Sequence, residues 1–130
     1  MKKRVTGIGG IFFKAKDRKA LMEWYQKHLG IEMEEWGASF PWKTEDGKDE
    51  ERYTAWSIFD SKSPYMEPSE KEFMINYQVE NLHELREILK EEGVHVFPET
   101  EESEFGKFGW ILDPEGQKIE LWEPPKSSES

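Results

Sequence analysis

The clearest indication of the fold of this chain is Phe108-Gly-Trp-Ile-Leu-Asp-Pro-Glu-Gly-Gln-Lys-Ile-Glu-Leu-Trp-Glu123. Its two outer runs are rich in apolar, aromatic and β-branched residues, and between them lies Asp113-Pro-Glu-Gly116. Asp before Pro begins a turn, and Gly supplies the positive φ that closes it. We therefore predict a hairpin of two antiparallel strands, at about 106–112 and 117–123.

The second strand of this hairpin has two different faces. Ile119 and Leu121 alternate with Glu120 and Trp122, and successive side chains of a strand point to opposite faces. One face is therefore expected to pack on a core, while the other presents a carboxylate beside an indole.

Burial in this chain depends on a few large side chains. The 130 residues are 35% apolar and 14% aromatic, with six Trp and eight Phe. This length predicts a single domain, at 1–125, and we expect residues 126–130 to be a disordered tail. The absence of Cys excludes disulfides, Cys-zinc sites and thiol nucleophiles.

The net charge of the chain limits the classes of partner that it can bind. The formal net charge is -10, with no basic stripe, which argues against nucleic acid as a partner. No apolar segment follows Met1-Lys-Lys-Arg4, so we expect neither a signal peptide nor a membrane span, and we predict a cytoplasmic protein.

The remaining elements follow from apolar periodicity and end signals. A helix at 18–29 is predicted, because Asp17 is an N-cap, Leu21, Trp24, Tyr25 and Leu29 form an apolar stripe, and Gly30 is a stop signal. A second helix runs between the N-cap Asn81 and Gly93, with Leu82, Leu85, Ile88 and Leu89 as its stripe. Strands are predicted at 5–14, 31–36, 52–59, 73–79 and 94–97. Residues 40–42 are assigned to a strand or a loop, 44–51 to a charged turn and 60–71 to a connection.

The chain contains an internal repeat. Gly10–Asp17 can be aligned with Met74–Asn81, and the two N-caps then coincide. Two halves, at about 5–59 and 72–123, each read as a strand, a helix and about three strands. We therefore predict an α+β fold of two βαβββ modules, which form a curved, incomplete barrel with the helices outside and a concave inner face.

These motifs resemble the vicinal oxygen chelate superfamily, which is the glyoxalase, bleomycin-resistance and dioxygenase group. The resemblance covers nearly the whole chain. It rests on Gly10–Asp17 leading into Trp24-Tyr25 and His28-Leu-Gly-Ile31, on Val79–Leu85 with Glu92-Gly-Val94, and on Asp113–Glu123. It implies the glyoxalase/bleomycin-resistance fold without specifying a reaction.

The resemblance also implies where a divalent metal ion would lie. The matching positions are Gly10, Met74, Glu120 and, by the offset between the halves, Trp56. Gly has no ligand atom, Met is a soft ligand and Trp only donates, so one carboxylate is left. His28 and His83 fall on outer helices, and only His95 could face inward. We therefore predict that the metal site has been lost and that no cofactor is bound.

Strand alternation predicts the lining of the concave side. The residues placed there are Gly10, Phe12, Trp56, Met74, Asn76, Glu120 and Trp122, and Trp42 or Trp110 is expected to add a wall. Ile11, Phe13, Ile75, Tyr77, Val79, Ile119 and Leu121 are expected to face the helices. A lining of this kind, apolar with a few polar groups, is typical of a small-molecule pocket.

Three functions remain open. The first is a binding protein for a hydrophobic or aromatic small molecule, as in the antibiotic-resistance branch of the resembled family. The second is an enzyme of the lyase or isomerase type, in which Glu120 moves a proton on a small carbonyl compound, or a metal-dependent glyoxalase-like enzyme. The third is an assembly domain with a vestigial pocket. In each case we expect a homodimer, because members of the resembled family pair across open sheet edges.

Overall fold

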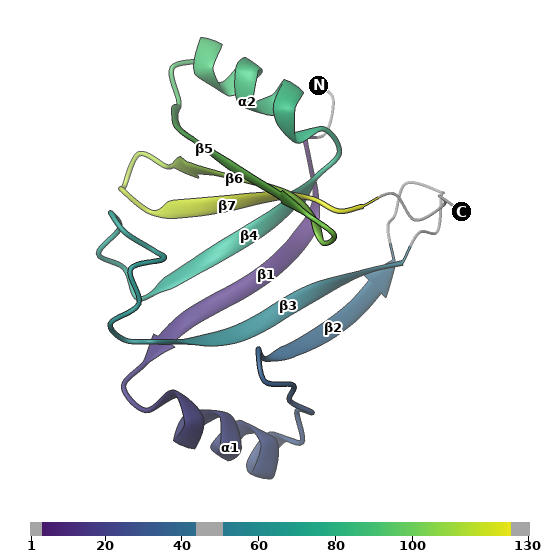
Figure 1. The fold of residues 1–130 in the computed structure, drawn as a ribbon, viewed down its shortest axis with the longest axis vertical. Helices are drawn as coiled ribbons and strands as arrows, with labels where there is room; N and C mark the ends of the chain where they lie inside the picture. Colours follow the sequence, from purple (N-terminus) through teal and green to yellow (C-terminus); the bar gives the residue numbers. More distant parts are fainter. Residues whose placement is uncertain (1–3, 44–50, 126–130) are drawn as a thin grey trace.

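The computed structural model describes residues 4–43 and 51–125, which form one seven-stranded sheet and two helices (Figure 1). The elements in chain order are β1 (Val5–Ala15), α1 (Arg18–Leu29), β2 (Ala38–Lys43), β3 (Glu51–Asp60), β4 (Phe73–Val79), α2 (Leu82–Glu91), β5 (His95–Ser103), β6 (Gly106–Leu112) and β7 (Lys118–Glu123). Among the residues described, neither helix has the length and apolarity needed to cross a bilayer.

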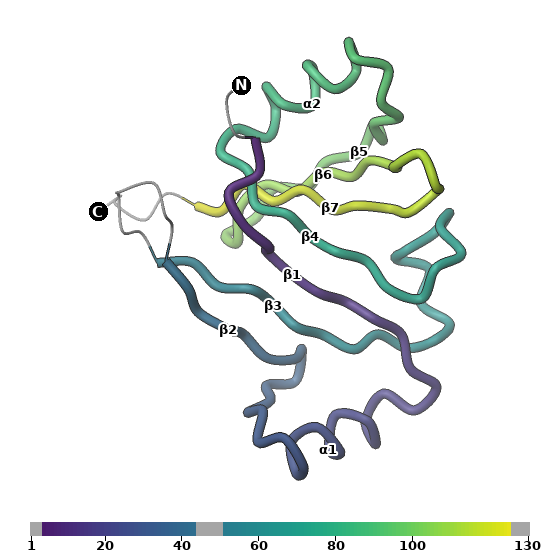
Figure 2. Tube along the Cα trace, turned by 180° about the vertical axis from the view of Figure 1, so that it is seen from behind, coloured from purple at the N-terminus to yellow at the C-terminus, as the bar shows by residue number. Residues whose placement is uncertain are grey.

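The sheet order β2-β3-β1-β4-β7-β6-β5 contains the internal repeat. β1 runs parallel to β3, β4 runs parallel to β7, and β1 and β4 join the two halves in antiparallel fashion. β2 and β5 form the open edges of the curved sheet (Figure 2). α1 lies beside β1 and β3 at one end, and α2 lies beside β5, β6 and β7 at the other (Figure 1). The predicted α+β fold class is thereby confirmed.

The end signals of both helices act as predicted. The Asp17 side chain accepts a hydrogen bond from the Ala20 amide at 3.1 Å, and Gly30 takes a left-handed φ of 69° after the last turn. Asn81 accepts from the Glu84 amide at 3.1 Å. These contacts pair backbone donors that a helix start leaves without intrahelical partners.

The first half differs from the prediction at residues 31–36, where no strand forms. The backbone amides and carbonyls of Glu34 and Gly37 pair with each other in a tight turn. Arg18 donates to the Glu35 carbonyl at 2.8 Å, and Ser57 donates to the Trp36 carbonyl at 2.6 Å. Side chains thus bind the backbone carbonyls that a strand would use for pairing with a neighbour. As a result, the first half has two strands after its helix instead of three.

Two strands, β2 and β5, extend over residues that were not assigned firmly to a strand. β2 includes residues 40–42, and β5 extends past 97 through the glutamate-rich segment to Ser103, with a register shift between Val96 and Thr100. The final hairpin is confirmed, and Gly116 closes its turn with a φ of 81°. The predicted charged turn lies outside the described residues except for its last residue, and the predicted tail at 126–130 lies outside them entirely.

The core divides between the two faces of the sheet. Val79, Leu82, Leu85 and Leu121 form a buried cluster under α2, and Phe12, Met66 and Met74 form a second cluster on the concave side. By contrast, α1 has no buried residue, and Trp24 of its apolar stripe is 51% exposed. The sheet is therefore covered more completely by α2 than by α1.

Candidate functional site

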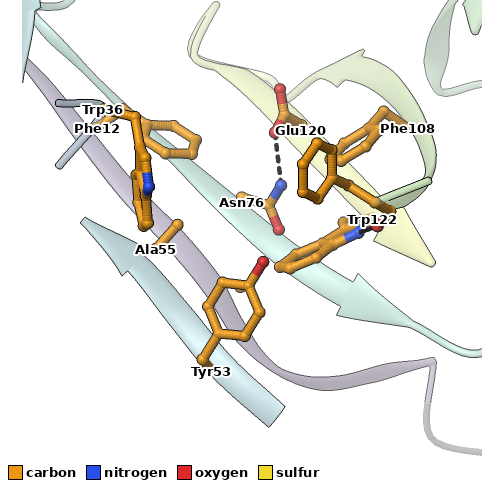
Figure 3. A pocket seen from close by; sticks show the side chains of 10 residues that line it. Phe12, Trp36, Tyr53, Ala55, Asn76, Phe108, Glu120 and Trp122 are labelled. Atoms are coloured by element: carbon orange, nitrogen blue, oxygen red, sulfur yellow. Dashed lines mark hydrogen bonds between the residues drawn. The ribbon is translucent and has the colours of Figure 1, made fainter. Parts of the chain in front are cut away.

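A cavity of about 390 Å³ lies on the concave side of the sheet (Figure 3). Six of its ten lining residues are aromatic, and no Lys, Arg or His is among these ten. The lining residues are Gly9, Phe12, Trp36, Tyr53, Ala55, Asn76, Phe105, Phe108, Glu120 and Trp122. The lining comes from both halves of the repeat, so the cavity exists only where the two halves meet.

Glu120 is the buried acid of this cavity, with 3% of its surface exposed. Its Oε2 accepts a hydrogen bond from Asn76 Nδ2 at 2.6 Å (Figure 3). Its Oε1 accepts from Trp110 Nε1 at 2.9 Å and from the Tyr65 hydroxyl. An indole N–H and an amide N–H can only donate, so both carboxylate oxygens serve as acceptors.

Burial governs the titration of this network. Burial raises the pKa of Glu120, although the hydrogen bonds from Tyr65, Asn76 and Trp110 oppose the shift. The pKa of Tyr65 is also raised, first by burial and then by the nearby charge of Glu120. Tyr65 therefore keeps its proton at neutral pH and remains a donor to the carboxylate.

Lys118 lies behind the network and does not line the cavity. Its Nζ donates to the Tyr65 carbonyl at 2.8 Å and lies 5.4 Å from the centre of the Tyr65 ring and 5.7 Å from that of Trp110. Burial lowers the pKa of Lys118, and the charges of Glu120, Glu99 and Glu67 oppose this shift. Lys118 thus ties the connection between the halves to β7.

Seven predicted pocket residues fall on or next to the cavity. Phe12, Asn76, Glu120 and Trp122 line it. Gly10 pairs with Asn76 in the sheet, and Met74 is fully buried against Phe12 and Met66. Trp110 reaches the site through its hydrogen bond to Glu120 rather than as a wall.

The prediction that Trp56 lies on the concave side is wrong. Its ring packs on the helix side, 5.0 Å from Tyr25 and 5.4 Å from Phe13, and Ala55 lines the cavity instead. A shift of one residue moves a side chain to the other face of a sheet. Phe12 pairs with Ser57 as Asn76 pairs with Glu120, so Ser57 is the counterpart of Glu120. The two halves align with a one-residue gap between Gly30 and Gly93. When the same gap is carried over to the strands after the helices, Ser57 rather than Trp56 aligns with Glu120.

Trp42 was also expected as a wall and does not line the cavity. Its indole covers Gly7, where an added Cβ would come within 2.3 Å of the ring. Its Nε1 donates to Thr54 Oγ1 at 2.9 Å, and that hydroxyl donates to the Ile8 carbonyl at 2.6 Å. Trp42 therefore fastens β2 and β3 to β1.

Sequence reasoning missed several residues of the site. Gly9 lines the cavity because β1 has a register irregularity between Ile8 and Gly10, which no sequence signal marks. Tyr65 comes from a connection without periodicity. Phe108 could have been found, because the predicted hairpin pairs it with Trp122 and their rings stack 5.7 Å apart.

The residues present do not fit the metal ion that the fold implies. Of the four matching positions in the corrected register, Gly10 has no ligand atom, Met74 is a soft ligand, and Ser57 is a neutral hydroxyl that is hydrogen-bonded to the Trp36 carbonyl. Both oxygens of Glu120 accept hydrogen bonds from protein donors. Within residues 4–43 and 51–125 no three His, Asp or Glu side chains are grouped to hold a metal, and His95 is exposed.

Comparison with known proteins identifies the fold. No protein-family model and no curated protein sequence matches this chain. Among solved structures, a methylmalonyl-CoA epimerase variant from Streptomyces coelicolor in complex with 2-nitronate-propionyl-CoA aligns with a TM-score of 0.68 at 16% identity, over 94% of this chain and 99% of that one. The methylmalonyl-CoA epimerase from Mycobacterium tuberculosis gives 0.61 at 18% identity, over 97% and 93%.

A third structure shows how broadly the fold is shared. The NAD-dependent benzaldehyde dehydrogenase from Legionella pneumophila aligns with a TM-score of 0.56 at 14% identity, over 89% of this chain and 98% of that one. At such identities the likeness concerns the fold alone. The comparison thus supports the predicted fold and specifies no activity.

Proposed function

We propose that this chain, which has the fold of the vicinal oxygen chelate superfamily, is a cytoplasmic protein that binds an aromatic or other apolar small molecule without a metal ion. The observation that carries the proposal is the lining of the 390 Å³ cavity, in which six aromatic side chains surround one amide and one carboxylate. Broad apolar contact with few orienting polar groups is the usual make-up of a ligand pocket.

The hydrogen bonds of Glu120 favour binding over catalysis. The carboxylate accepts from Tyr65, Asn76 and Trp110, and these contacts hold it in one orientation at the cavity wall. A group engaged by three donors is well placed to shape a pocket and less free to exchange a proton with a substrate.

Ligand-detected NMR with a panel of small aromatic compounds tests the proposal. We expect the wild type to bind members of the panel, and Phe105→Ala to weaken that binding, because Phe105 lines the cavity. Phe40→Ala is the matched control, since Phe40 is exposed to a similar degree but lies outside the cavity. Failure of the whole panel to bind, or equal loss in both variants, would contradict the proposal.

An isomerase or lyase acting on a small carbonyl compound is the second candidate. Burial raises the pKa of Glu120, and a base whose pKa lies nearer to neutral exchanges protons more effectively. Among the structures with this fold are methylmalonyl-CoA epimerases, which supports an isomerase as the reaction class. Metal-dependent glyoxalase chemistry is not proposed, because the residues at the metal position do not fit.

Deuterium uptake by carbonyl compounds in D₂O separates the two candidates. Exchange that the wild type catalyses and Glu120→Gln abolishes, while ligand binding persists, identifies an enzyme. Ligand binding with no exchange in either form identifies a binding protein. The folded state of the variant is checked by its urea unfolding curve, because Glu120 is buried.

We also propose that the protein is a homodimer. Within residues 4–43 and 51–125, the edge strands β2 and β5 have no neighbour on one side, and Ile8 and Ile11 of β1 are about 40% exposed. Open edges and exposed apolar side chains favour association. Light scattering after size exclusion measures the mass, and a monomer at micromolar concentration would contradict the proposal. A dimer that binds no compound of the panel would instead indicate an assembly domain with a vestigial pocket.

A further inference from the structure

We propose that the ligand of this cavity is an organic cation, whose positive charge enters the box formed by the aromatic side chains. The inference rests on the proposed binding function and adds the chemical class of the ligand. It follows from the charges and partial charges of the cavity wall, taken with its aromatic lining.

The two most buried polar side chains of the wall, Glu120 and Asn76, both carry acceptor oxygens. Glu120 is the single carboxyl group among the ten lining residues, and it accepts three hydrogen bonds from protein donors. The second acceptor is Asn76 Oδ1, which is buried without a hydrogen-bond partner among the described residues. Figure 3 shows this oxygen turned away from Glu120 toward Tyr53 and Trp122. Both groups place negative charge at the same wall.

Positive charge is kept away from the cavity. None of the ten lining residues is cationic, and the indole N–H of Trp122 is already bonded to the Phe105 carbonyl at 2.7 Å. Lys118, whose charge interacts with that of Glu120, does not line the cavity and contacts the rings of Tyr65 and Trp110 instead. An anionic ligand would therefore face the buried carboxylate of Glu120 with neutral donors such as the Tyr53 hydroxyl but no cationic side chain on the lining, which makes a phosphate or carboxylate compound a poor fit.

The aromatic lining supplies the attraction. The faces of Trp, Tyr and Phe rings carry partial negative charge, and several rings around one site bind ammonium groups. Trp36, Tyr53, Phe105, Phe108, Trp122 and Phe12 contribute six such rings. The formal net charge of -10 raises the local concentration of cations at the surface and favours the same ligand class.

A pair of isosteric probes tests the inference. The (3-hydroxyphenyl)trimethylammonium ion and 3-tert-butylphenol have nearly the same shape and differ in the charge of one group. Dissociation constants are measured by isothermal titration calorimetry at pH 7, where the hydroxyl group of both probes is mostly protonated, for the wild type, Glu120→Gln, Phe105→Leu and the control Phe40→Leu. We expect the cation to bind the wild type at least about tenfold more tightly than the phenol, since cation–π contacts in desolvated sites are strong.

Each variant has a defined expectation. Glu120→Gln removes the carboxylate of the wall, and Phe105→Leu keeps apolar volume but removes a ring. Each variant should therefore reduce the preference for the cation over 3-tert-butylphenol, so that the two dissociation constants become more alike. Phe105 is 58% exposed, so Phe105→Leu remains informative even if Glu120→Gln does not fold. Phe40→Leu should leave the ratio unchanged.

The outcomes separate this inference from the function on which it rests. Equal or tighter binding of 3-tert-butylphenol by the wild type overturns the cation proposal and leaves the binding function standing. A preference for the cation that neither Glu120→Gln nor Phe105→Leu changes also overturns it, because the preference then arises elsewhere. Absence of binding by both probes overturns the inference together with the pocket.

Discussion

Replacing Gly9 with alanine tests the geometry of the cavity wall. Gly9 lies in β1 at the register irregularity, is buried, and lines the cavity. A Cβ at this position would meet Asn76 Oδ1 at 2.2 Å, Trp122 Cε3 at 2.8 Å and Gln78 Cγ at 2.9 Å. All three neighbours belong to packed strands, so none can retreat freely.

The expected cost follows from these distances. Overpacking in a close-packed interior costs about 1–3 kcal/mol. The methyl group also restricts the unfolded chain, which returns about 0.4–1 kcal/mol. We therefore expect Gly9→Ala to lower the free energy of unfolding by about 1–2 kcal/mol. The shift of Asn76 also disturbs its 2.6 Å hydrogen bond to Glu120, so ligand affinity should fall as well.

Urea unfolding followed by tryptophan fluorescence measures the change. With a slope of about 1–3 kcal/mol per molar urea, the midpoint should fall by roughly 0.3–2 M. Gly109→Ala is the matched control, because Gly109 is also a buried strand glycine. Its added Cβ would meet Arg86 Cδ at 3.4 Å, which is near an ordinary contact. The control should keep its midpoint or gain slightly through the stiffer unfolded chain.

One result would refute this reasoning. If Gly9→Ala unfolded at the wild-type midpoint, with an unchanged slope and unchanged ligand affinity, the close approach of Asn76 and Trp122 to Gly9 would be wrong. A larger loss in Gly109→Ala than in Gly9→Ala would have the same meaning.

Three further predictions concern titration, metal and packing. Because burial raises the pKa of Glu120, its contribution to stability is present below the unfolded pKa and is lost as pH rises through the folded pKa. The stability of Glu120→Gln relative to wild type should therefore increase with pH above about 4.5, measured by urea unfolding at several pH values, and a constant or falling difference would contradict this. Protein purified without added ions should contain no stoichiometric zinc, nickel, manganese or iron by mass spectrometry, and EDTA should leave the melting temperature unchanged. Trp56→Ala should destabilise the fold by about 2–4 kcal/mol without changing the ratio of probe affinities, because the ring packs on Tyr25 and Phe13 outside the cavity. A changed ratio would place Trp56 at the cavity after all.

Several features could be predicted because local signals specify them. Asp17 and Asn81 fix the helix starts by hydrogen bonds within three residues, and the turn at Gly116 fixes the final hairpin. Glu120 and Asn76 were placed on one side from alternation alone, and their 2.6 Å contact follows from the parallel pairing of β4 and β7.

Features that depend on long-range contacts escaped prediction. Residues 31–36 alternate like a strand, yet hydrogen bonds from Arg18 and Ser57 hold this segment as a turn. Trp56 was placed one residue out of register, because a gap between the two halves shifts every later position.

Local patterns in the chain were enough to predict the element order, the repeat and the acidic, aromatic character of the site, because caps, turns and alternation act over a few residues. The aromatic rings that surround the cavity and the donors that reach Glu120 became known from the folded arrangement of the strands. The register of strand pairing sets the face of the sheet on which each ring lies. Tyr65 comes from the connection between the halves, and the position of this connection depends on contacts with β7. These contacts join residues more than fifty positions apart, so no local pattern encodes them.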